Sequence, residues 1–215
     1  MTKIAPSILA ADLAKISKEV IKVDKAGAEY IHIDIMDGHY VPNISFGHNI
    51  VKTLRPLTKK ILDVHLMITP VMPSIESFID AGADIISFHP EADDNPNTII
   101  ETIKNSNCKA GIAIHPDIEI EAIQEFLNGI DLVVVMTVLP GFSGQKFLEK
   151  QLSTIKKLYN IRDSIKAKFE IEIDGGINDK TSKQCIANGA DVLVAGSYIY
   201  SADESEYESL INSIR

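Results

Sequence analysis

Eight short runs rich in Ile and Val alternate with eight longer segments of helical apolar spacing along this chain. Such runs are typical of buried strands, and we expect strands at 4–8, 30–34, 61–66, 85–89, 110–114, 132–138, 170–173 and 192–195. We expect helices at 13–26, 49–54, 74–81, 97–105, 120–127, 147–165, 180–188 and 205–214. Because consecutive parallel strands need a crossover between them, this alternation predicts an α/β fold with a parallel sheet.

A closed (β/α)8 TIM barrel, formed as a single domain by residues 1–215, fits eight β–α pairs best. The alternative is an open doubly wound sheet, but the first β–α turn carries no GxGxxG phosphate fingerprint. No linker, low-complexity tract or charge block divides the chain. A Gly-Ala-acid triplet recurs at 27–29, 82–84 and 189–191, each time between an expected helix and the next strand.

Charge and composition narrow the class of partner. The net charge of −9 argues against nucleic acid or an anionic membrane, although a local backbone site can still bind an anionic small molecule. The N-terminus has no signal-peptide pattern, and no apolar run approaches the ~18 residues of a membrane span. The two cysteines, Cys108 and Cys185, have no metal-binding spacing. We therefore expect a soluble, cytoplasmic protein.

Polar side chains gather at the carboxyl ends of the expected strands, where barrel enzymes place their chemistry. His32 and Asp34 end the second strand, His65 the third and Asp174 the seventh. Each alone could be a hydrogen-bonded core residue or a turn cap, but their common position predicts a functional cluster. Two imidazoles and two carboxylates suit one divalent ion, with Zn, Fe, Mn and Co all open. Two acids also suit proton transfer on opposite faces of a substrate whose oxyanion the metal stabilises.

Methionines and glycines complete the expected site. Met36, Met67 and Met136 lie near strand ends and are expected to line it, although buried methionine is more often core filler. Glycine-rich turns at 140–145, 174–177 and 195–197 would let backbone N–H groups and helix N-termini approach a phosphate. The loop at 139–147 is long enough for a lid, the alternative being a static surface loop.

Four histidines are left outside the expected metal set. His39 and His48 lie in a polar loop and are expected to be solvated. His89 and His115 precede prolines at the ends of the fourth and fifth strands, so they face the same rim. We expect these two to be structural or to support the site from behind.

Several long motifs resemble a known family along almost the whole chain. They are Ala-Pro-Ser-Ile-Leu-Ala-Ala-Asp at 5–12, His-Ile-Asp-Ile-Met-Asp-Gly-His-Tyr-Val-Pro-Asn at 32–43, Asp-Val-His-Leu-Met at 63–67, Val-Met-Thr-Val at 135–138 with Pro-Gly-Phe at 140–142, Ile-Asp-Gly-Gly-Ile at 173–177 and Ala-Asp-Val-Leu-Val-Ala-Gly-Ser at 190–197. The chain resembles ribulose-phosphate 3-epimerases, (β/α)8 enzymes of the pentose phosphate pathway.

The resemblance implies interconversion of D-ribulose 5-phosphate and D-xylulose 5-phosphate at C3 through a 2,3-enediolate. It implies that His32, Asp34, His65 and Asp174 hold the metal, and that Asp34 and Asp174 are the catalytic acid–base pair. It also implies a set of substrate contacts, with the sugar on Ser7 and His65, the methionines over the enediolate and the phosphate on the glycine loops: Ser7, Met36, His65, Met67, Met136, Gly141, Phe142, Ser143, Gly144, Asp174, Gly175, Gly176, Gly196 and Ser197. Members of this family often associate, so we expect a homo-oligomer.

Two positions depart from the family pattern Asn-Pro-Gly-Phe-Gly-Gly-Gln, which reads Leu139-Pro-Gly-Phe-Ser143-Gly-Gln here. Ser143 keeps its N–H but has less freedom at positive φ, and Leu139 removes a polar side chain near the lid hinge. One alternative is a 3-epimerase of a related ketose phosphate such as allulose 6-phosphate, and another is a non-catalytic sensor of metal and sugar phosphate. The presence of both Asp34 and Asp174 favours an enzyme. The absence of lysine from 32–37 disfavours the Asp-x-Lys-x-x-Asp chemistry of orotidine-phosphate decarboxylase.

Overall fold

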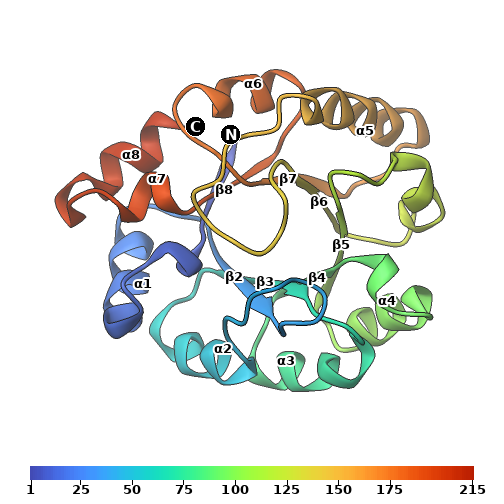
Figure 1. Cartoon of the computed structure of the whole chain (residues 1–215), viewed down its shortest axis with the longest axis horizontal. Helices are drawn as coiled ribbons and strands as arrows, with labels where there is room; N and C mark the ends of the chain where they lie inside the picture. Colours follow the sequence, from blue (N-terminus) through green and yellow to red (C-terminus); the bar gives the residue numbers. More distant parts are fainter.

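Eight parallel strands form the inner ring of the structure, a computed structural model that describes residues 1–215 (Figure 1). The strand order is β1-β8-β7-β6-β5-β4-β3-β2. The ring closes between β1 and β2. An isolated β-bridge joins Ser7 to His32, and the backbone N–H of Glu29 donates to the carbonyl of Ile4. The expected (β/α)8 barrel is confirmed, with strands β1 (Lys3–Pro6), β2 (Tyr30–Met36), β3 (Ile61–Met67), β4 (Ile85–Phe88), β5 (Lys109–Ile114), β6 (Leu132–Met136), β7 (Glu170–Asp174) and β8 (Val192–Ala195).

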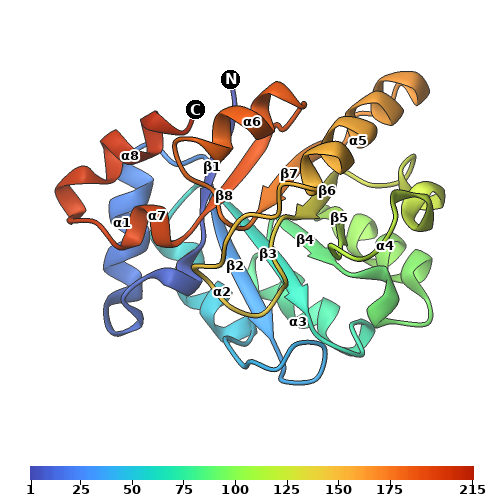
Figure 2. The same cartoon turned by 45° about the horizontal axis from the view of Figure 1, so that its top comes forward.

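Helices form the outer ring and cover the strands on all sides (Figures 1 and 2). They are α1 (Ile16–Lys25), α2 (His48–Leu54), α3 (Ile75–Ala81), α4 (Pro96–Asn105), α5 (Gln151–Ile165), α6 (Thr181–Ala187), α7 (Ser197–Tyr200) and α8 (Tyr207–Ser213). The first expected helix starts as a 3₁₀ turn at Leu13–Lys15 before it becomes α1. None of these helices has both the length and the apolar character needed to span a bilayer.

The expected helices differ most from the structure at 120–127 and 147–150, and the one expected at 205–214 begins with a 3₁₀ turn, Glu204–Glu206, before α8. The segment 120–127 is a 3₁₀-helix, η6 (Ile120–Phe126), because its buried residues Ile120, Ile123 and Phe126 recur every three positions. A 3₁₀-helix has three residues per turn, so this spacing places all three on one face. The helix expected from 147 begins only at Gln151, because the backbone N–H of Leu148 donates to Thr137 O at the end of β6 (2.8 Å).

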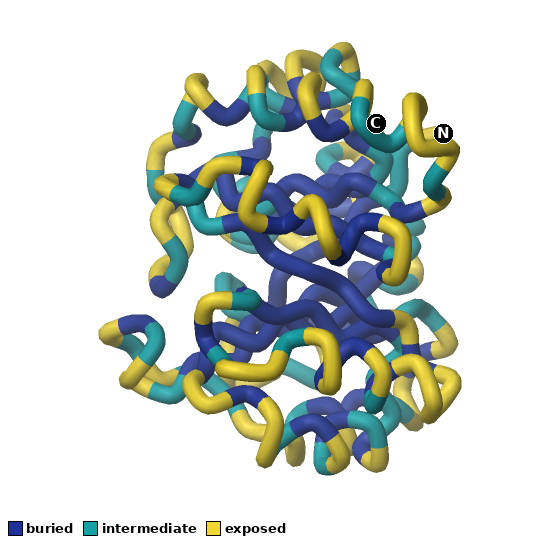
Figure 3. Tube along the Cα trace, turned by 90° about the vertical axis from the view of Figure 1, so that its right-hand side faces the viewer, coloured by how far each residue is buried: buried dark blue, intermediate teal, exposed yellow.

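The strands are buried on both faces, as expected for a parallel sheet enclosed by helices. All seven residues of β2 are buried, and the tube in Figure 3 shows the buried segments at the centre of the molecule with the exposed ones outside. Several polar side chains are fully enclosed in this apolar interior: His32, Asp63, His65, His89 and Glu172. Because burial of polar groups is costly without partners, these residues mark the part of the barrel where chemistry is to be sought.

The recurring Gly-Ala-acid triplets stabilise the opposite, amino-terminal end of the barrel. Their glycines adopt positive φ angles of 95° to 108°, which end the preceding helices. Their acids accept hydrogen bonds from the backbone of a neighbouring strand: Asp84 Oδ2 accepts from Leu62 N (2.8 Å) and also pairs with Arg55 (2.6 Å). In the same way, Glu29 accepts from the backbone N–H of Ile4 and pairs with Arg215. Asp191 accepts from the backbone N–H of Ile171 and pairs with Arg162.

Candidate active site

The four expected metal ligands converge at the carboxyl ends of β2, β3 and β7. His32 Nε2 lies 3.5 Å from Asp34 Oδ1 and 3.8 Å from Asp174 Oδ2. His65 Nδ1 lies 3.8 Å from Asp34 Oδ1 and 3.6 Å from Asp174 Oδ2. One ligand atom from each residue lies within 4.8 Å of all the others. Strand register brings them together, because Asp34 is the direct partner of His65 in the β2–β3 pair.

This arrangement fits a divalent cation. A tetrahedral ion with donors at 2.0–2.2 Å requires donor–donor separations of roughly 3.3–3.6 Å, and the four nitrogen–oxygen separations are 3.5–3.8 Å. His32 Nε2 and His65 Nδ1 are both buried and have no hydrogen-bond partner. Two unpartnered imidazole nitrogens facing two carboxylates are the donor set that Zn, Fe, Mn or Co would accept.

The electrostatics of the cluster favour positive charge at its centre. Burial would lower the pKa of His32, but the negative charges of Asp63 and Asp34 outweigh it and raise that pKa well above its ordinary value. Burial would raise the pKa of Asp34, but the charge of His32 and a hydrogen bond from Ser7 Oγ (2.5 Å) keep it below its ordinary value. Asp34 is therefore ionised at neutral pH.

Two further acids lie behind His32. Asp63 Oδ2 is 2.6 Å from His32 Nδ1, because the two residues are direct partners in the β2–β3 register. Glu172 lies 3.4 Å from the same nitrogen, and burial followed by the charge of Asp63 raises its pKa well above the ordinary value. Glu172 is absent from the residues expected at the site. Its position two residues before Asp174, on the same face of β7, is the signal that could have indicated it.

The histidines outside the metal set have different surroundings. The side chain of His39 is 77% exposed and His48 is also exposed, in agreement with the expectation that both are solvated. His115 is partly buried at the rim. His89 is fully enclosed, and its Nε2 lies 3.1 Å from Nε2 of His65. It therefore contacts the cluster directly from behind.

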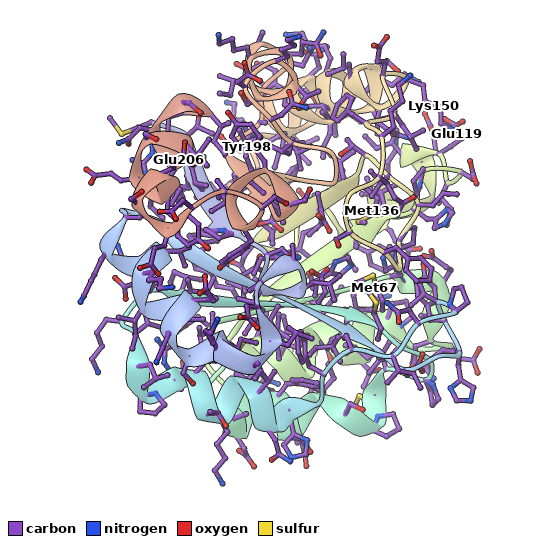
Figure 4. The ribbon with its side chains drawn as sticks, turned by 60° about the vertical axis from the view of Figure 1, so that its left-hand side comes forward. Met67, Glu119, Met136, Lys150, Tyr198 and Glu206 are labelled. Atoms are coloured by element: carbon purple, nitrogen blue, oxygen red, sulfur yellow. The ribbon has the colours of Figure 1, made fainter.

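A cavity opens above the cluster, and all the expected substrate-contacting residues except His65 line it. Met36 and Met67 are direct partners in the β2–β3 register, and Met136 is paired with Asp174 across β6 and β7. Figure 4 labels Met67 and Met136, whose side chains both border the cavity. Glycines form much of the remaining wall, and His65 lies below the floor, fully buried.

The loop at 139–147 lies across the barrel opening (Figure 1, the yellow loop after β6). Gly141 and Gly144 have positive φ angles of 122° and 74°, whereas Ser143 does not. Serine in place of glycine at 143 therefore adds no backbone strain. The loop is held from inside by Gln145 Nε2, which donates to the carbonyl of Phe142 (2.8 Å), and from outside by Asn43 Nδ2, which donates to the carbonyl of Gly141 (2.8 Å).

Comparison with known proteins places this barrel in a family. The model of the "Ribulose-phosphate 3 epimerase family" matches residues 3–200. The chain belongs to this family. It is 45% identical to ribulose-phosphate 3-epimerase of Bacillus subtilis (strain 168), over 100% of this chain and 99% of the relative. It is 38% identical to ribulose-phosphate 3-epimerase of Escherichia coli (strain K12), over 99% of this chain and 94% of the relative. The resemblance carried by the sequence motifs is confirmed.

Solved structures of lower identity share the fold of this epimerase family member. The 3-hexulose-6-phosphate synthase of Salmonella typhimurium superposes with a TM-score of 0.73 at 18% identity, over 99% of this chain and 96% of that chain. KGPDC of Streptococcus mutans gives a TM-score of 0.73 at 17% identity, over 100% of this chain and 95% of that chain. At these identities the comparison concerns the barrel alone.

Proposed function

We propose that this chain interconverts D-ribulose 5-phosphate and D-xylulose 5-phosphate by epimerisation at C3, with one divalent metal ion as cofactor. The observation that carries the proposal is the convergence of Asp34 and Asp174 with two unpartnered imidazole nitrogens below a glycine-lined cavity. Membership of the ribulose-phosphate 3-epimerase family supports the substrate and the reaction.

The two aspartates act as the acid–base pair. One carboxylate removes the C3 proton and leaves its electron pair in a 2,3-enediolate, and the other returns a proton to C3 on the opposite face. Asp34 is ionised at neutral pH because its pKa lies below the ordinary value, so it is free to accept a proton, and Ser7 Oγ holds its Oδ2 in place. Asp34 and Asp174 come from strands β2 and β7, so they approach the cavity from different sides of the ring.

His32, Asp34, His65 and Asp174 would hold the metal ion. When bound, a divalent cation supplies positive charge that stabilises the oxyanion formed as the C3 proton leaves. Met36, Met67 and Met136 cover the reacting carbons with apolar surface and exclude water from them. Ser7 contacts the sugar hydroxyls in this proposal. The expected sugar contact from His65 is not retained, because its ring is fully buried and does not line the cavity. The donor set is compatible with Zn, Fe, Mn or Co, and zinc and iron suit its imidazoles best.

In this proposal the phosphate binds to backbone N–H groups of the glycine loops. Gly141, Phe142, Ser143 and Gly144 from one loop, with Gly175, Gly176, Gly196 and Ser197 from the ends of β7 and β8, share this wall of the cavity. A Cβ on Gly176 would lie 2.8 Å from the backbone N of Phe147, so only glycine permits this close approach. No lysine or arginine lines the cavity. Backbone N–H groups and the hydroxyls of Ser143 and Ser197 are therefore the donors open to the anion in this acidic protein.

Hydrogen exchange at C3 tests the proposal. The protein is incubated with D-ribulose 5-phosphate in deuterated water, with and without a chelator, and C3 is followed by NMR. We expect deuterium at C3 of the xylulose 5-phosphate formed, little in the ribulose 5-phosphate recovered early, and loss of both turnover and exchange on chelation. Turnover of allulose 6-phosphate but not of the pentose would move the substrate to a six-carbon ketose. Binding without exchange of either sugar would indicate a sensor.

The proposal also covers localisation, assembly and partners. We propose a cytoplasmic homo-oligomer that does not act on nucleic acid or membranes. The net charge of −9 supports the lack of polyanionic partners. The proposal of association rests on the family, whose members often associate. Light scattering coupled to gel filtration measures the assembly, and a monomeric mass would contradict it.

A further inference from the structure

A row of contacting side chains runs from the expected metal ligand His65 toward the surface of the protein. His65 Nε2 lies 3.1 Å from His89 Nε2, and both rings are fully buried. His89 Nδ1 in turn lies 3.5 Å from Glu91 Oε1. Tyr40 OH donates to the same carboxylate oxygen (2.8 Å), and its ring lies against that of His89 with centroids 4.8 Å apart. The reaction proposed above assigns no role to His89, Glu91 or Tyr40.

The local chain brings these groups together. His89 follows β4 directly, and Pro90 begins a single 3₁₀ turn, Pro90–Ala92, which returns Glu91 toward the histidine ring. Tyr40 comes from the loop after β2 and orients the carboxylate from the outer side. The side chain of Glu91 is 34% exposed, so the row begins at the surface and ends inside the barrel.

The placement of the protons along this row follows from the donors and acceptors. A neutral imidazole carries one N–H, so a contact between two ring nitrogens needs one donor and one acceptor. His89 Nδ1 has no hydrogen-bond partner, since Glu91 Oε1 is 3.5 Å away, but the negative charge of this carboxylate still favours a proton on Nδ1. His89 Nε2 then accepts, and His65 Nε2 must donate. His65 Nδ1 is left with a free lone pair that faces Asp34 and Asp174.

We propose that His89, oriented by Glu91, is a positioning residue that holds His65 in the tautomer whose Nδ1 can bind the divalent cation. This inference rests on the metal site of the proposed function. The opposite tautomer of His89 would donate to His65 Nε2 and force the proton of His65 onto Nδ1, where it would point at the metal position. Partners of this kind behind a ligating histidine fix its orientation and contribute about 10–100-fold to metal affinity.

The two ligating histidines differ in the partners behind them. His32 has the carboxylate of Asp63 at 2.6 Å from its Nδ1, whereas His65 has the ring of His89, and the carboxylate of Glu91 is one step further away. A carboxylate in direct contact makes an imidazole a stronger donor to a metal than a neutral ring does. The structure therefore assigns His65 as the weaker of the two nitrogen ligands, and the one whose contribution depends on a tautomer.

Metal affinity tests the proposal without reference to turnover. The dissociation constants for Zn²⁺ and Co²⁺ are measured by competition with a chromophoric chelator for the full chain and its variants. We expect His89→Phe to weaken binding about 10–100-fold, while His89→Gln, whose amide oxygen can accept from His65 Nε2, restores most of the loss. Glu91→Leu is expected to weaken binding about tenfold, because it removes the acceptor oxygen that favours a proton on His89 Nδ1. His115→Gln is the control, since His115 lies 6.5 Å from His89, ring to ring, on the far side from His65.

Two spectra identify the mechanism. A long-range proton–nitrogen-15 correlation of the Zn²⁺-loaded protein is expected to show a proton on Nε2 of His65, and the absorption bands of bound Co²⁺ are expected to change in His89→Phe. Unchanged affinity in His89→Phe and Glu91→Leu would overturn the positioning role and leave the metal site intact. Equal losses in His89→Phe and His89→Gln would assign His89 to packing alone and overturn it as well. A wild-type chain that binds neither ion would overturn the metal site, and this inference with it.

Discussion

The hydrogen bond from Asn43 to the loop at 139–147 gives a direct test of whether this loop is a lid. Asn43 Nδ2 donates to the carbonyl of Gly141 (2.8 Å) across the cavity mouth, with Asn43 partly exposed and Gly141 buried. A neutral hydrogen bond of this kind contributes a net stabilisation of about 0.5–1.5 kcal/mol, and partial exposure points to the lower half of that range. If the loop opens to admit substrate, Asn43→Ala destabilises only the closed form. The KM for the sugar phosphate should then rise roughly 2–5-fold, the equivalent of about 0.5–1 kcal/mol.

The assay separates this role from a local effect on the turn. Asn43 Oδ1 also accepts from the backbone N–H of Ile44 (2.9 Å), and Asn43→Asp keeps this acceptor while it removes the donor to Gly141. We therefore expect Asn43→Asp to raise KM at least as much as Asn43→Ala. The inhibition constant of inorganic phosphate should rise in parallel. An unchanged KM in both variants, with a lower melting temperature, would show that the loop is static and would refute the reasoning.

Three further predictions concern catalysis, stability and thiol chemistry. Asp174→Asn should lower kcat by about 10²–10⁴-fold while calorimetry still detects sugar-phosphate binding, and near-normal turnover would exclude Asp174 as an acid–base residue. Tyr207→Phe should lower the free energy of unfolding in urea by about 1–3 kcal/mol, because it removes the donor to buried Glu19 Oε2 (2.7 Å). Tyr200→Phe is the matched control and is expected to be neutral or stabilising, since its buried hydroxyl has no partner. Equal losses of stability in the two variants would contradict the argument. Burial raises the pKa of both cysteines to about 12, so a thiol reagent at pH 8 should react only after unfolding, and stability should fall as the pH rises above the unfolded thiol pKa of about 8.5; rapid reaction of the folded protein would be inconsistent with this burial.

The alternation of apolar strands and helices was sufficient to predict the barrel, because the period of the side chains reflects which faces are buried. The same alternation placed His32 and Asp34 on one side of β2 and Asp174 at the end of β7. The rule that barrel chemistry lies at the carboxyl ends of strands then predicted a common site. The family motifs added the identity of the sugar, which periodicity alone does not contain.

The local structure differs from the sequence-based prediction where contacts with distant residues determine it. Ile120, Ile123 and Phe126 form a 3₁₀-helix because they pack on one face against the barrel. Residues 147–150 are not helical because Leu148 is bonded to the end of β6, which lies beside it only in the folded chain. A helical apolar pattern does not distinguish these outcomes, since the competing contacts come from distant residues.

The surroundings of the metal ligands were decided by strand register and ring closure. His32 and Asp63 are 31 residues apart in sequence and are brought to 2.6 Å by the pairing of β2 with β3. His65 and His89, 24 residues apart, meet only because β4 pairs with β3 and places the next turn behind the His65 ring. The sequence by itself determined which side chains face the interior. Which of them touch depends on the register of neighbouring strands, because a shift of one residue would reverse every inward-facing side chain.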